Sequence, residues 1–256
     1  LNVEAGKTAT LNVSDTPKVT DTLIELFKID METQKDAPQG DASLEGAEFT
    51  WKFYAGHYTV DNLPSEPTKT WVTKTIAEKD SDGTIHYVSR LSDEYKVSGD
   101  SFYTQDGKNV LPLGTLTVEE TKAPNGYLLD GAYMQANGSE EQIKGMYLTQ
   151  ITEDGDIAVL SGSNQYHVSE KVIRGGVKIQ KRDLETSDTK GQGSATLKDA
   201  EFEIISLNDN AVLVEGKLYN KGEVVKTILT DIEGVASTSA DLLPYGKFRI
   251  EESNAP

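Results

Sequence analysis

The chain has 256 residues, a formal net charge of −17, 36% hydrophobic residues and no cysteine. This hydrophobic content suits one large or two ordinary folded domains and excludes a wholly disordered chain. The acidic balance argues against nucleic acid and anionic membrane surfaces as partners, because both would repel the protein. The lack of cysteine excludes disulfides, thiolate nucleophiles and cysteine-ligated metals.

The first residues have neither the charged region nor the apolar region of a secretory signal. No stretch of the sequence approaches the roughly 20 apolar residues that a membrane span needs, so we expect no membrane insertion in this chain. We therefore expect the sequence to be a piece of a longer precursor. Within its first segment, residues 8–13 alternate apolar and polar side chains, which is typical of a β-strand.

Short alternating runs continue along the chain, for example at residues 116–119 and 247–250. They place apolar side chains on one face of a strand. Turn-forming pairs such as Asp82-Gly83 and Asn137-Gly138 separate these runs. No segment has a sustained helical period. The sequence therefore predicts an all-β protein built as a β-sandwich architecture.

An internal repeat is the strongest sign of organisation, because landmarks recur in the same order after Lys28 and after Lys181. In each copy a six-residue segment that begins with leucine and ends in Ala-Glu-Phe starts 16 positions after the lysine (44 − 28 and 197 − 181). A Leu-Pro-x-Gly element, a Glu-Glu pair and an Ala-Pro pair follow in register. The matched elements are Leu44–Phe49 with Leu197–Phe202, and Leu111–Gly114 with Leu243–Gly246.

The first copy is longer than the second. From Phe49 to Leu111 there are 62 positions, and from Phe202 to Leu243 there are 41, which indicates an insertion of roughly 20 residues in the first copy. We expect several aromatic residues to lie in or beside this insertion. They are Trp51, Phe53, Tyr54, Tyr58 and Trp71.

A partial third copy precedes the first, since Val13-Ser14-Asp15 resembles Val168-Ser169-Glu170. Residues 1–17 are therefore predicted to be closing strands of a preceding domain. Residues 21–173 are predicted to form a complete domain, and residues 176–256 a domain truncated before its last strand. Arg174-Gly175-Gly176 would then be a short joint between them.

Residues 120–127, Glu-Thr-Lys-Ala-Pro-Asn-Gly-Tyr, resemble the E-box of Cna-B-type domains, which occur in pilins and collagen-adhesin stalks of Gram-positive bacteria. Together with the lysine and the element at 44–49, the resemblance covers nearly the whole chain. The second copy keeps the lysine and the glutamate but departs at Ser253-Asn254. The resemblance implies tandem reverse-Ig, prealbumin-like β-sandwiches, so that all three predicted segments would be of Cna-B type.

The resemblance also implies chemistry without a cofactor. In such domains a lysine on the first strand is joined to an Asn or Asp side chain on the last strand by an autocatalytic isopeptide bond. Burial favours the neutral, nucleophilic amine and keeps a nearby glutamate protonated, so that this glutamate can relay protons. Carried over, Lys28 is the amine and Glu120 the proton relay, Lys181 and Glu252 are their equivalents in the truncated domain, and Asp15 is the acceptor of the preceding domain.

The acceptor of the complete domain departs from the family pattern, because Glu170 stands at the position of Asn or Asp. A glutamate carries the same carboxyl one methylene further out, and we take it as the expected acceptor. Asn164 is the alternative, although it lies six positions earlier and would need a register change or a bulge in the strand.

These inferences predict a structural stalk or pilus-backbone module on the extracellular, cell-wall-anchored surface of a Gram-positive bacterium, and no turnover enzyme. Its expected partners are neighbouring domains or subunits of the same surface protein. The alternative is an adhesin that binds a host extracellular matrix protein or glycan through the aromatic insertion, at about residues 50–110. The spacing of His57, His86 and His167 does not suit a metal site, so no metal is expected.

Overall fold

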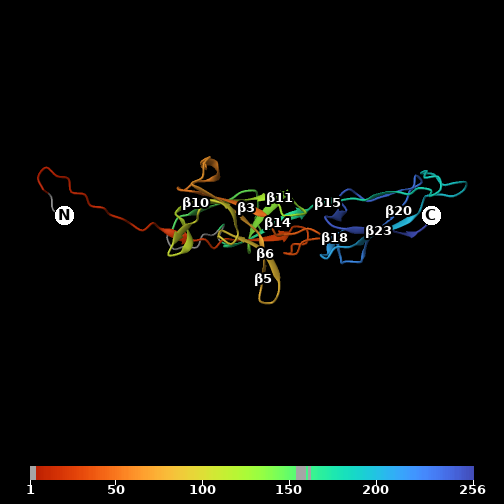
Figure 1. Cartoon of the computed structure of the whole chain (residues 1–256), viewed down its shortest axis with the longest axis horizontal. Coiled ribbons are helices and arrows are strands. Elements are labelled where there is room, and N and C mark those ends of the chain that lie inside the picture. The colour runs from red at the N-terminus through yellow and green to blue at the C-terminus, as the bar shows by residue number, and fades with distance from the viewer. Residues whose placement is uncertain (1–3, 154–159, 161–162) are drawn as a thin grey trace.

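The computed structural model describes residues 4–153, 160 and 163–256. Its regular elements are β-strands, apart from one 3-10 helix, η1 (Val60–Asn62), so the all-β prediction is confirmed. The molecule is elongated, with the N-terminal tail at one end and the C-terminus at the other (Figure 1). Among the described residues, no helix is long and apolar enough to cross a membrane.

Two facing sheets form what we call the first sandwich. One sheet has five strands in the order β13 (Tyr147–Ile151), β10 (Gly114–Lys122), β3 (Glu48–Tyr54), β4 (Lys69–Lys74) and β7 (Lys96–Gly99). The other has six strands in the order β12 (Gln142–Lys144), β11 (Tyr127–Ala136), β14 (Gln165–Val172), β2 (Glu25–Asp30), β6 (Ile85–Arg90) and β5 (Ile76–Lys79). A small sheet of β1 (Val19–Asp21), β9 (Lys108–Pro112) and β8 (Tyr103–Gln105) lies at one end.

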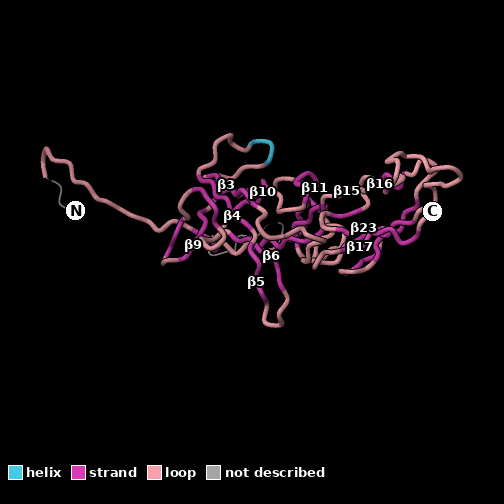
Figure 2. The backbone as a smooth tube through the Cα atoms, turned by 45° about the vertical axis from the view of Figure 1, so that its right-hand side comes forward, coloured by secondary structure: helices cyan, strands magenta, loops and turns pink. Residues whose placement is uncertain are grey.

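The order of the six-stranded sheet brings together the first and last strands of the first sandwich. Strand β2 pairs with β14 in parallel, with Lys28 opposite Val168 and Asp30 opposite Glu170. Strand β6 pairs with the other edge of β2 in antiparallel fashion. The inward side chains of both sheets form one apolar core that includes Leu26, Trp51, Leu116 and Tyr166. The β5–β6 hairpin and the loop carrying η1 project from this body (Figure 2).

The C-terminal part forms what we call the second sandwich, with a separate apolar core that includes Phe202, Ile204 and Val225. Its strands form one three-stranded sheet and several two-stranded sheets. The sheet has the order β20 (Val224–Leu229), β17 (Glu201–Ser206) and β23 (Phe248–Asn254). The pairs are β16 (Lys178–Gln180) with β21 (Val235–Ser237), β18 (Val212–Val214) with β19 (Lys217–Tyr219), and β15 (Arg174–Gly175) with β22 (Leu243–Pro244).

The N-terminal tail differs from its predicted strand. Residues 4–18 are exposed or partly exposed and form no strand, whereas residues 1–3 of the predicted segment lie outside the described part of the chain. An isolated strand leaves its backbone groups without ladder partners, so the alternating pattern of residues 8–13 does not produce a strand here. That this segment closes a preceding domain stays a prediction.

The extra length of the first copy lies largely after β6 rather than around the aromatic residues. Leu111 follows Arg90, the end of β6, by 21 positions, and Leu243 follows Ser237, the end of β21, by 6 positions. Strands β7 and β8 fill this added segment. The aromatic residues instead lie mostly on β3 and β4, which correspond to β17 and β20 of the second sandwich.

The aromatic side chains named for the alternative binding face belong mostly to the core. Trp51 and Trp71 are fully buried, and Phe53 and Tyr54 are buried as well. The indole nitrogen of Trp51 donates a hydrogen bond to Thr73 Oγ1 at 2.8 Å, which satisfies its polar atom inside the core. Only Tyr58 of the set is half-buried.

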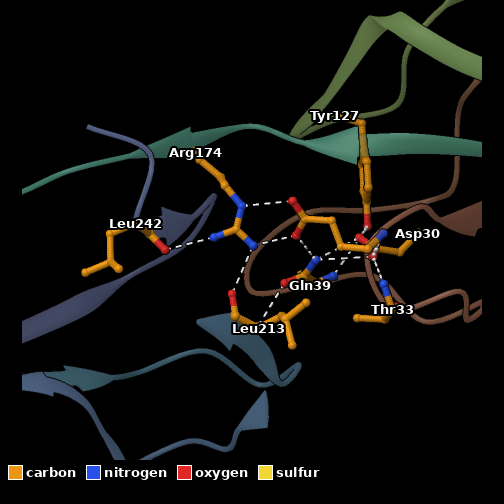
Figure 3. Close-up of polar contacts among 8 residues, drawn as sticks. Asp30, Thr33, Gln39, Tyr127, Arg174, Leu213 and Leu242 are labelled. Carbon is orange, nitrogen blue, oxygen red and sulfur yellow. Dashed lines mark hydrogen bonds and ion pairs between the residues drawn. The ribbon is translucent and has the colours of Figure 1, made fainter. Parts of the chain in front are cut away.

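Arg174 connects the two sandwiches at what we call the joint (Figure 3). Its Nε donates to Glu32 Oε1 at 2.9 Å, and its Nη2 also donates to this carboxylate. Its Nη1 donates to the backbone carbonyl of Leu242 at 2.8 Å, and its Nη2 also donates to that of Leu213 at 2.9 Å. A planar guanidinium can satisfy this set of acceptors at once, whereas a lysine ammonium cannot reproduce its geometry.

The polar network of the joint continues into the first sandwich (Figure 3). The amide of Gln39 accepts from the backbone N–H of Leu213 at 2.8 Å and donates to Asp30 Oδ2 at 3.1 Å. The hydroxyl of Tyr127 donates to the same carboxylate oxygen at 2.8 Å. Gly126 precedes this tyrosine with φ 84°, and a Cβ there would lie 2.8 Å from the ring of Tyr245. The Gly-Tyr pair therefore has both a backbone and a packing role.

We predict that Trp51→Ala lowers the free energy of unfolding by about 3–5 kcal/mol, because it leaves a large cavity in the core. Chemical denaturation of the purified chain measures this change. Val60→Ala is the control, since Val60 is 65% exposed and should change stability by less than about 0.5 kcal/mol. Similar effects of the two substitutions would contradict the buried position of the tryptophan.

A double-mutant cycle of Arg174→Ala and Glu32→Ala should give a coupling energy between about 0.5 and 3 kcal/mol, because the pair is mostly buried and hydrogen-bonded. The exposed ion pair between Lys247 and Asp41, 2.8 Å apart, also spans the two sandwiches and serves as the control. Its coupling should stay below about 1 kcal/mol. If the coupling energy of Arg174 and Glu32 does not exceed that of Lys247 and Asp41, the joint does not depend on Arg174.

Candidate functional site

Lys28 lies inside the first sandwich. The alternation of β2 turns Leu26 and Lys28 toward the core, and Lys28 is fully buried despite its ammonium group. A lysine is almost never fully buried unless a partner compensates its charge. Its surroundings therefore decide what this side chain can do.

Two glutamates approach the Lys28 amine from different sheets. Glu120 extends from β10 in the facing sheet and places Oε2 2.6 Å from Nζ, where it accepts a hydrogen bond. Glu170 extends from β14, the neighbour of β2, and places Oε2 2.9 Å from Nζ. The three side chains are at most 1% exposed. The structure thus brings together the three residues predicted for the complete domain.

The electrostatics of this cluster favour a protonated carboxyl. Burial raises the pKa of Glu120 to about 8; the positive charge of Lys28 lowers it, and the negative charge of Glu170 adds to the rise. Burial also raises the pKa of Glu170, although Lys28 opposes this. One ammonium cannot neutralise two carboxylates in so buried a site, so a proton is held on the pair near neutral pH.

Several carboxyl oxygens of the cluster have no hydrogen bond outside the cluster. They are Glu120 Oε1 and both oxygens of Glu170, which are buried and have only the other members of the cluster as hydrogen-bonding neighbours. Buried polar atoms of this kind are costly and are uncommon in folded proteins. The cluster therefore lacks the hydrogen bonds that would fully stabilise two buried carboxyl groups as long as no covalent bond joins Lys28 to either of them.

The geometry removes Asn164 as the acceptor. It precedes the first residue of β14 and lies near Glu25, whose backbone N–H donates to its carbonyl at 2.7 Å. Strand β14 runs from Gln165 to Glu170 beside β2 without a register shift, and a strand rises roughly 3.3 Å per residue. The bulge or register change that Asn164 required is absent from this pairing.

In the second sandwich, Lys181 and Glu252 also lie together. Lys181 Nζ donates to the two carboxylate oxygens of Glu252 at 2.6 and 2.8 Å. The side chains are 18% and 36% exposed, so this pair is open to solvent where the first is not. Asp15, the predicted acceptor of a preceding domain, is exposed on the tail.

Sequence reasoning missed the loop that follows each lysine strand. Asp30 Oδ1 accepts from the backbone N–H groups of Glu32 and Thr33, and from the side chain of Gln39. Asp183 Oδ1 accepts in the same way from the residues at the matching positions, Glu185, Thr186 and Gln192. Both copies share the motif Lys-x-Asp-x-Glu-Thr with a glutamine nine positions after the aspartate. This motif could have predicted the loop.

The histidines do not form a metal centre. His86 lies between the carboxylates of Asp36 and Asp80, and His57 contacts the carbonyl of Ile151 at 3.0 Å. His167 is exposed on β14. In the part of the chain that the structure covers, no group of three or more histidines and acidic residues is placed to hold a metal ion.

The family comparison agrees with the β-sandwich architecture of the second sandwich. Residues 175–256 match the family model of SpaA, described as a prealbumin-like fold domain. A search of curated proteins finds no match. Among solved structures, the chain is similar to the Bacillus anthracis TIE protein, with 21% identity and a TM-score of 0.42 over 99% of this chain and 32% of that one. The chain therefore spans about a third of the length of that protein.

A pH dependence follows from the raised glutamate pKa values. In a Lys28→Met variant, Glu120 and Glu170 stay buried without their cation. Because their pKa values are higher in the folded chain than the ordinary value of 4.5, the folded state binds more protons than the unfolded state. Stability should then be greatest below about pH 4.5 and decrease as the pH rises through about 8.

Urea denaturation of this variant across that range measures the effect. Adding Glu120→Gln to Lys28→Met removes one titrating carboxyl while keeping its size, so the double variant should show a flatter profile. A single variant whose stability rises with pH, or whose profile matches that of the double variant, would contradict the proposed charge balance.

Proposed function

We propose that this chain, whose residues 175–256 form a prealbumin-like domain of the SpaA type, is a structural stalk or pilus-backbone module of a bacterial surface protein, cross-linked internally by an isopeptide bond between Lys28 and Glu170. The observation that carries the proposal is the position of Lys28 Nζ, 2.6 Å from Glu120 and 2.9 Å from Glu170 in a fully buried site. Such a cluster is expected of a reaction centre rather than of an ordinary ion pair.

The proposed reaction uses only these three side chains. The Lys28 ammonium gives a proton to the Glu120 carboxylate, and the neutral amine attacks the carboxyl carbon of Glu170. Glu120 then protonates the hydroxyl that leaves from the Glu170 carboxylic acid and takes up the second proton of the attacking nitrogen as the amide forms, so that Glu120 ends protonated. A C–N bond forms, a C–O bond breaks and one water leaves, so no cofactor or oxidant is required.

Amide formation also relieves the electrostatic cost of the cluster. Two buried ions cost several kcal/mol each in desolvation, and their attraction offsets this only with good hydrogen-bond geometry. The bond replaces the ammonium and one carboxyl by a neutral amide. Protonated Glu120, whose pKa is raised to about 8, can then donate a hydrogen bond to the amide carbonyl.

A Lys28–Glu170 bond would carry tension across the first sandwich. It joins β2 to β14, which are neighbours at the beginning and the end of this sandwich. It closes a loop of 142 positions (170 − 28), and chain-entropy arguments for a cross-link of that length give about 5 kcal/mol of stabilisation. A pulling force applied at the two ends would pass through the bond and leave the enclosed strands in place.

The SpaA-type domain supports a surface-protein module and an extracellular location. Attachment to a cell wall and a Gram-positive source belong to the proposal, with neighbouring domains or subunits of the same protein as partners. A host protein or glycan as a further partner remains a prediction without a site, because Trp51, Tyr54 and Trp71 are buried. Turnover catalysis has no part in the proposal, which needs one self-cross-linking event per chain.

Intact-mass spectrometry of the denatured chain tests the bond. The expected mass is lower than that of the sequence by one water, with a branched peptide that joins Lys28 to Glu170 after digestion. Glu120→Ala should restore the unmodified mass, because it removes the proton relay. Glu119→Ala is the matched control, since its neighbour Glu119 is about 37% exposed and should keep the water loss. An unmodified mass of the parent chain would contradict the proposal.

A further inference from the structure

Lys28 and Glu170 stand at strand positions that are not paired with each other. In the parallel pair of β2 and β14, Lys28 is opposite Val168, and Glu170 is opposite Asp30. At roughly 3.3 Å per residue, the two side chains bridge an offset of about 6–7 Å along the strands. A slip of one residue would turn Glu170 to the other face of the sheet. Their contact, 2.9 Å from Glu170 Oε2 to Lys28 Nζ, therefore depends on the register of β14 against β2.

The other neighbour of β14 does not fix this register at Glu170. The register of β11 against β14 shifts between Leu128 and Tyr133, whose partners are Lys171 and Ser169. Glu170 lies between these two partners, where the regular ladder is interrupted. An irregularity of this kind disrupts strand pairing locally. Contacts outside the ladder of β11 and β14 must therefore hold the backbone of β14 at this residue.

One such contact comes from the turn that Asp30 forms at the end of β2. Asp30 Oδ1 accepts from the backbone N–H groups of Glu32 at 3.0 Å and Thr33 at 2.8 Å. Between them and the aspartate, Met31 directs its own backbone N–H at the backbone carbonyl of Glu170, at 2.9 Å. The turn thus fixes the donor that holds the β14 backbone at Glu170 from the side of β2.

The second contact of Asp30 reaches the strand on the other side of β14. Asp30 Oδ2 accepts from the hydroxyl of Tyr127 at 2.8 Å (Figure 3). Burial and the negative charge of Asp30 raise the pKa of Tyr127 well above its ordinary value, so the hydroxyl keeps its proton and donates. Tyr127 begins β11 and pairs with Val172, two residues after Glu170. One carboxylate therefore ties together both strands that flank β14.

We propose that Asp30 is a positioning residue for the cross-link between Lys28 and Glu170, an inference that rests on the proposed function. Through Met31 and Tyr127 it holds β14 in the register that keeps the carboxyl carbon of Glu170 within reach of the Lys28 amine. Asp30 exchanges no proton in the reaction, which leaves that role to Glu120. Its effect is on orientation, and a misplacement of about 1 Å can slow a reaction by about 100-fold.

The rate of water loss in freshly made chain tests this role. The whole chain is produced by cell-free translation, translation is stopped, and intact-mass spectrometry follows the fraction of chain that has lost one water. Asp30→Ala should slow this step by roughly 10- to 100-fold, because it releases both Met31 and Tyr127. Tyr127→Phe should slow it by about 3- to 10-fold, because it removes one hydrogen bond to an ionised acceptor.

A conservative variant distinguishes position from charge. Asp30→Asn keeps an oxygen that accepts from the N–H groups of Glu32 and Thr33, and its amide can still pair with the hydroxyl of Tyr127. It should therefore react within about threefold of the parent rate, as expected when the loss of a single ionised partner is the only change. An Asp30→Asn chain as slow as Asp30→Ala would overturn the assignment of a positioning role.

Two matched controls lie elsewhere in the chain. Asp183→Ala removes the corresponding turn of the second sandwich. Tyr95→Phe removes the hydroxyl of another buried tyrosine of the first sandwich, whose partners are Glu78 and Arg90. Both should keep the rate within about twofold of the parent, because neither touches the contacts of β14.

Urea denaturation of each variant, made in a Lys28→Met chain that cannot cross-link, shows whether the first sandwich still folds. If Asp30→Ala does not fold, the milder Tyr127→Phe variant decides. A folded variant that loses water at the parent rate overturns the positioning role while the cross-link stands. A parent chain that never loses water contradicts the cross-link itself, and the positioning role with it.

Discussion

The burial of one ammonium and two carboxyls between two β-sheets is the constraint on which the rest of the structure depends. Lys28 and Glu170 come from neighbouring strands of one sheet, and Glu120 comes from the facing sheet. Because charges are stable in such a site only when they neutralise one another, the two sheets must meet in a fixed register. The same requirement places the beginning and the end of the first sandwich side by side.

A continuous set of polar contacts extends from this region to the second sandwich. Asp30 follows Lys28 by two residues and receives Tyr127 and Gln39, while Arg174 joins Glu32 to carbonyls of the second sandwich. The two sandwiches are therefore connected by side chains with specific geometry, in addition to the chain itself. The second sandwich repeats the lysine–glutamate pair and the aspartate-centred loop of the first.

The sequence could predict the all-β fold and the residues of the cluster because the repeat matched strands whose inward faces alternate. The spacing of its landmarks matched Lys28 with Lys181, and the resemblance to Cna-B-type domains implied that Lys28, Glu120 and Glu170 act together. It could not predict that Trp51 and Trp71 are buried, since a composition rich in aromatic residues fits a core as well as a binding face. Nor could it show that residues 8–13 lack a strand, because strand formation depends on a partner distant in sequence.

Single-molecule force spectroscopy, with the chain held by its two ends, tests most directly whether the first sandwich transmits tension through Lys28 and Glu170. If they are joined, the 142 positions between them stay folded or looped, and no extension from that segment appears at forces that unfold the second sandwich. A Lys28→Ala chain should release it, with a gain in length of about 500 Å at roughly 3.5 Å per residue. The same gain in length in the unaltered chain would contradict the account.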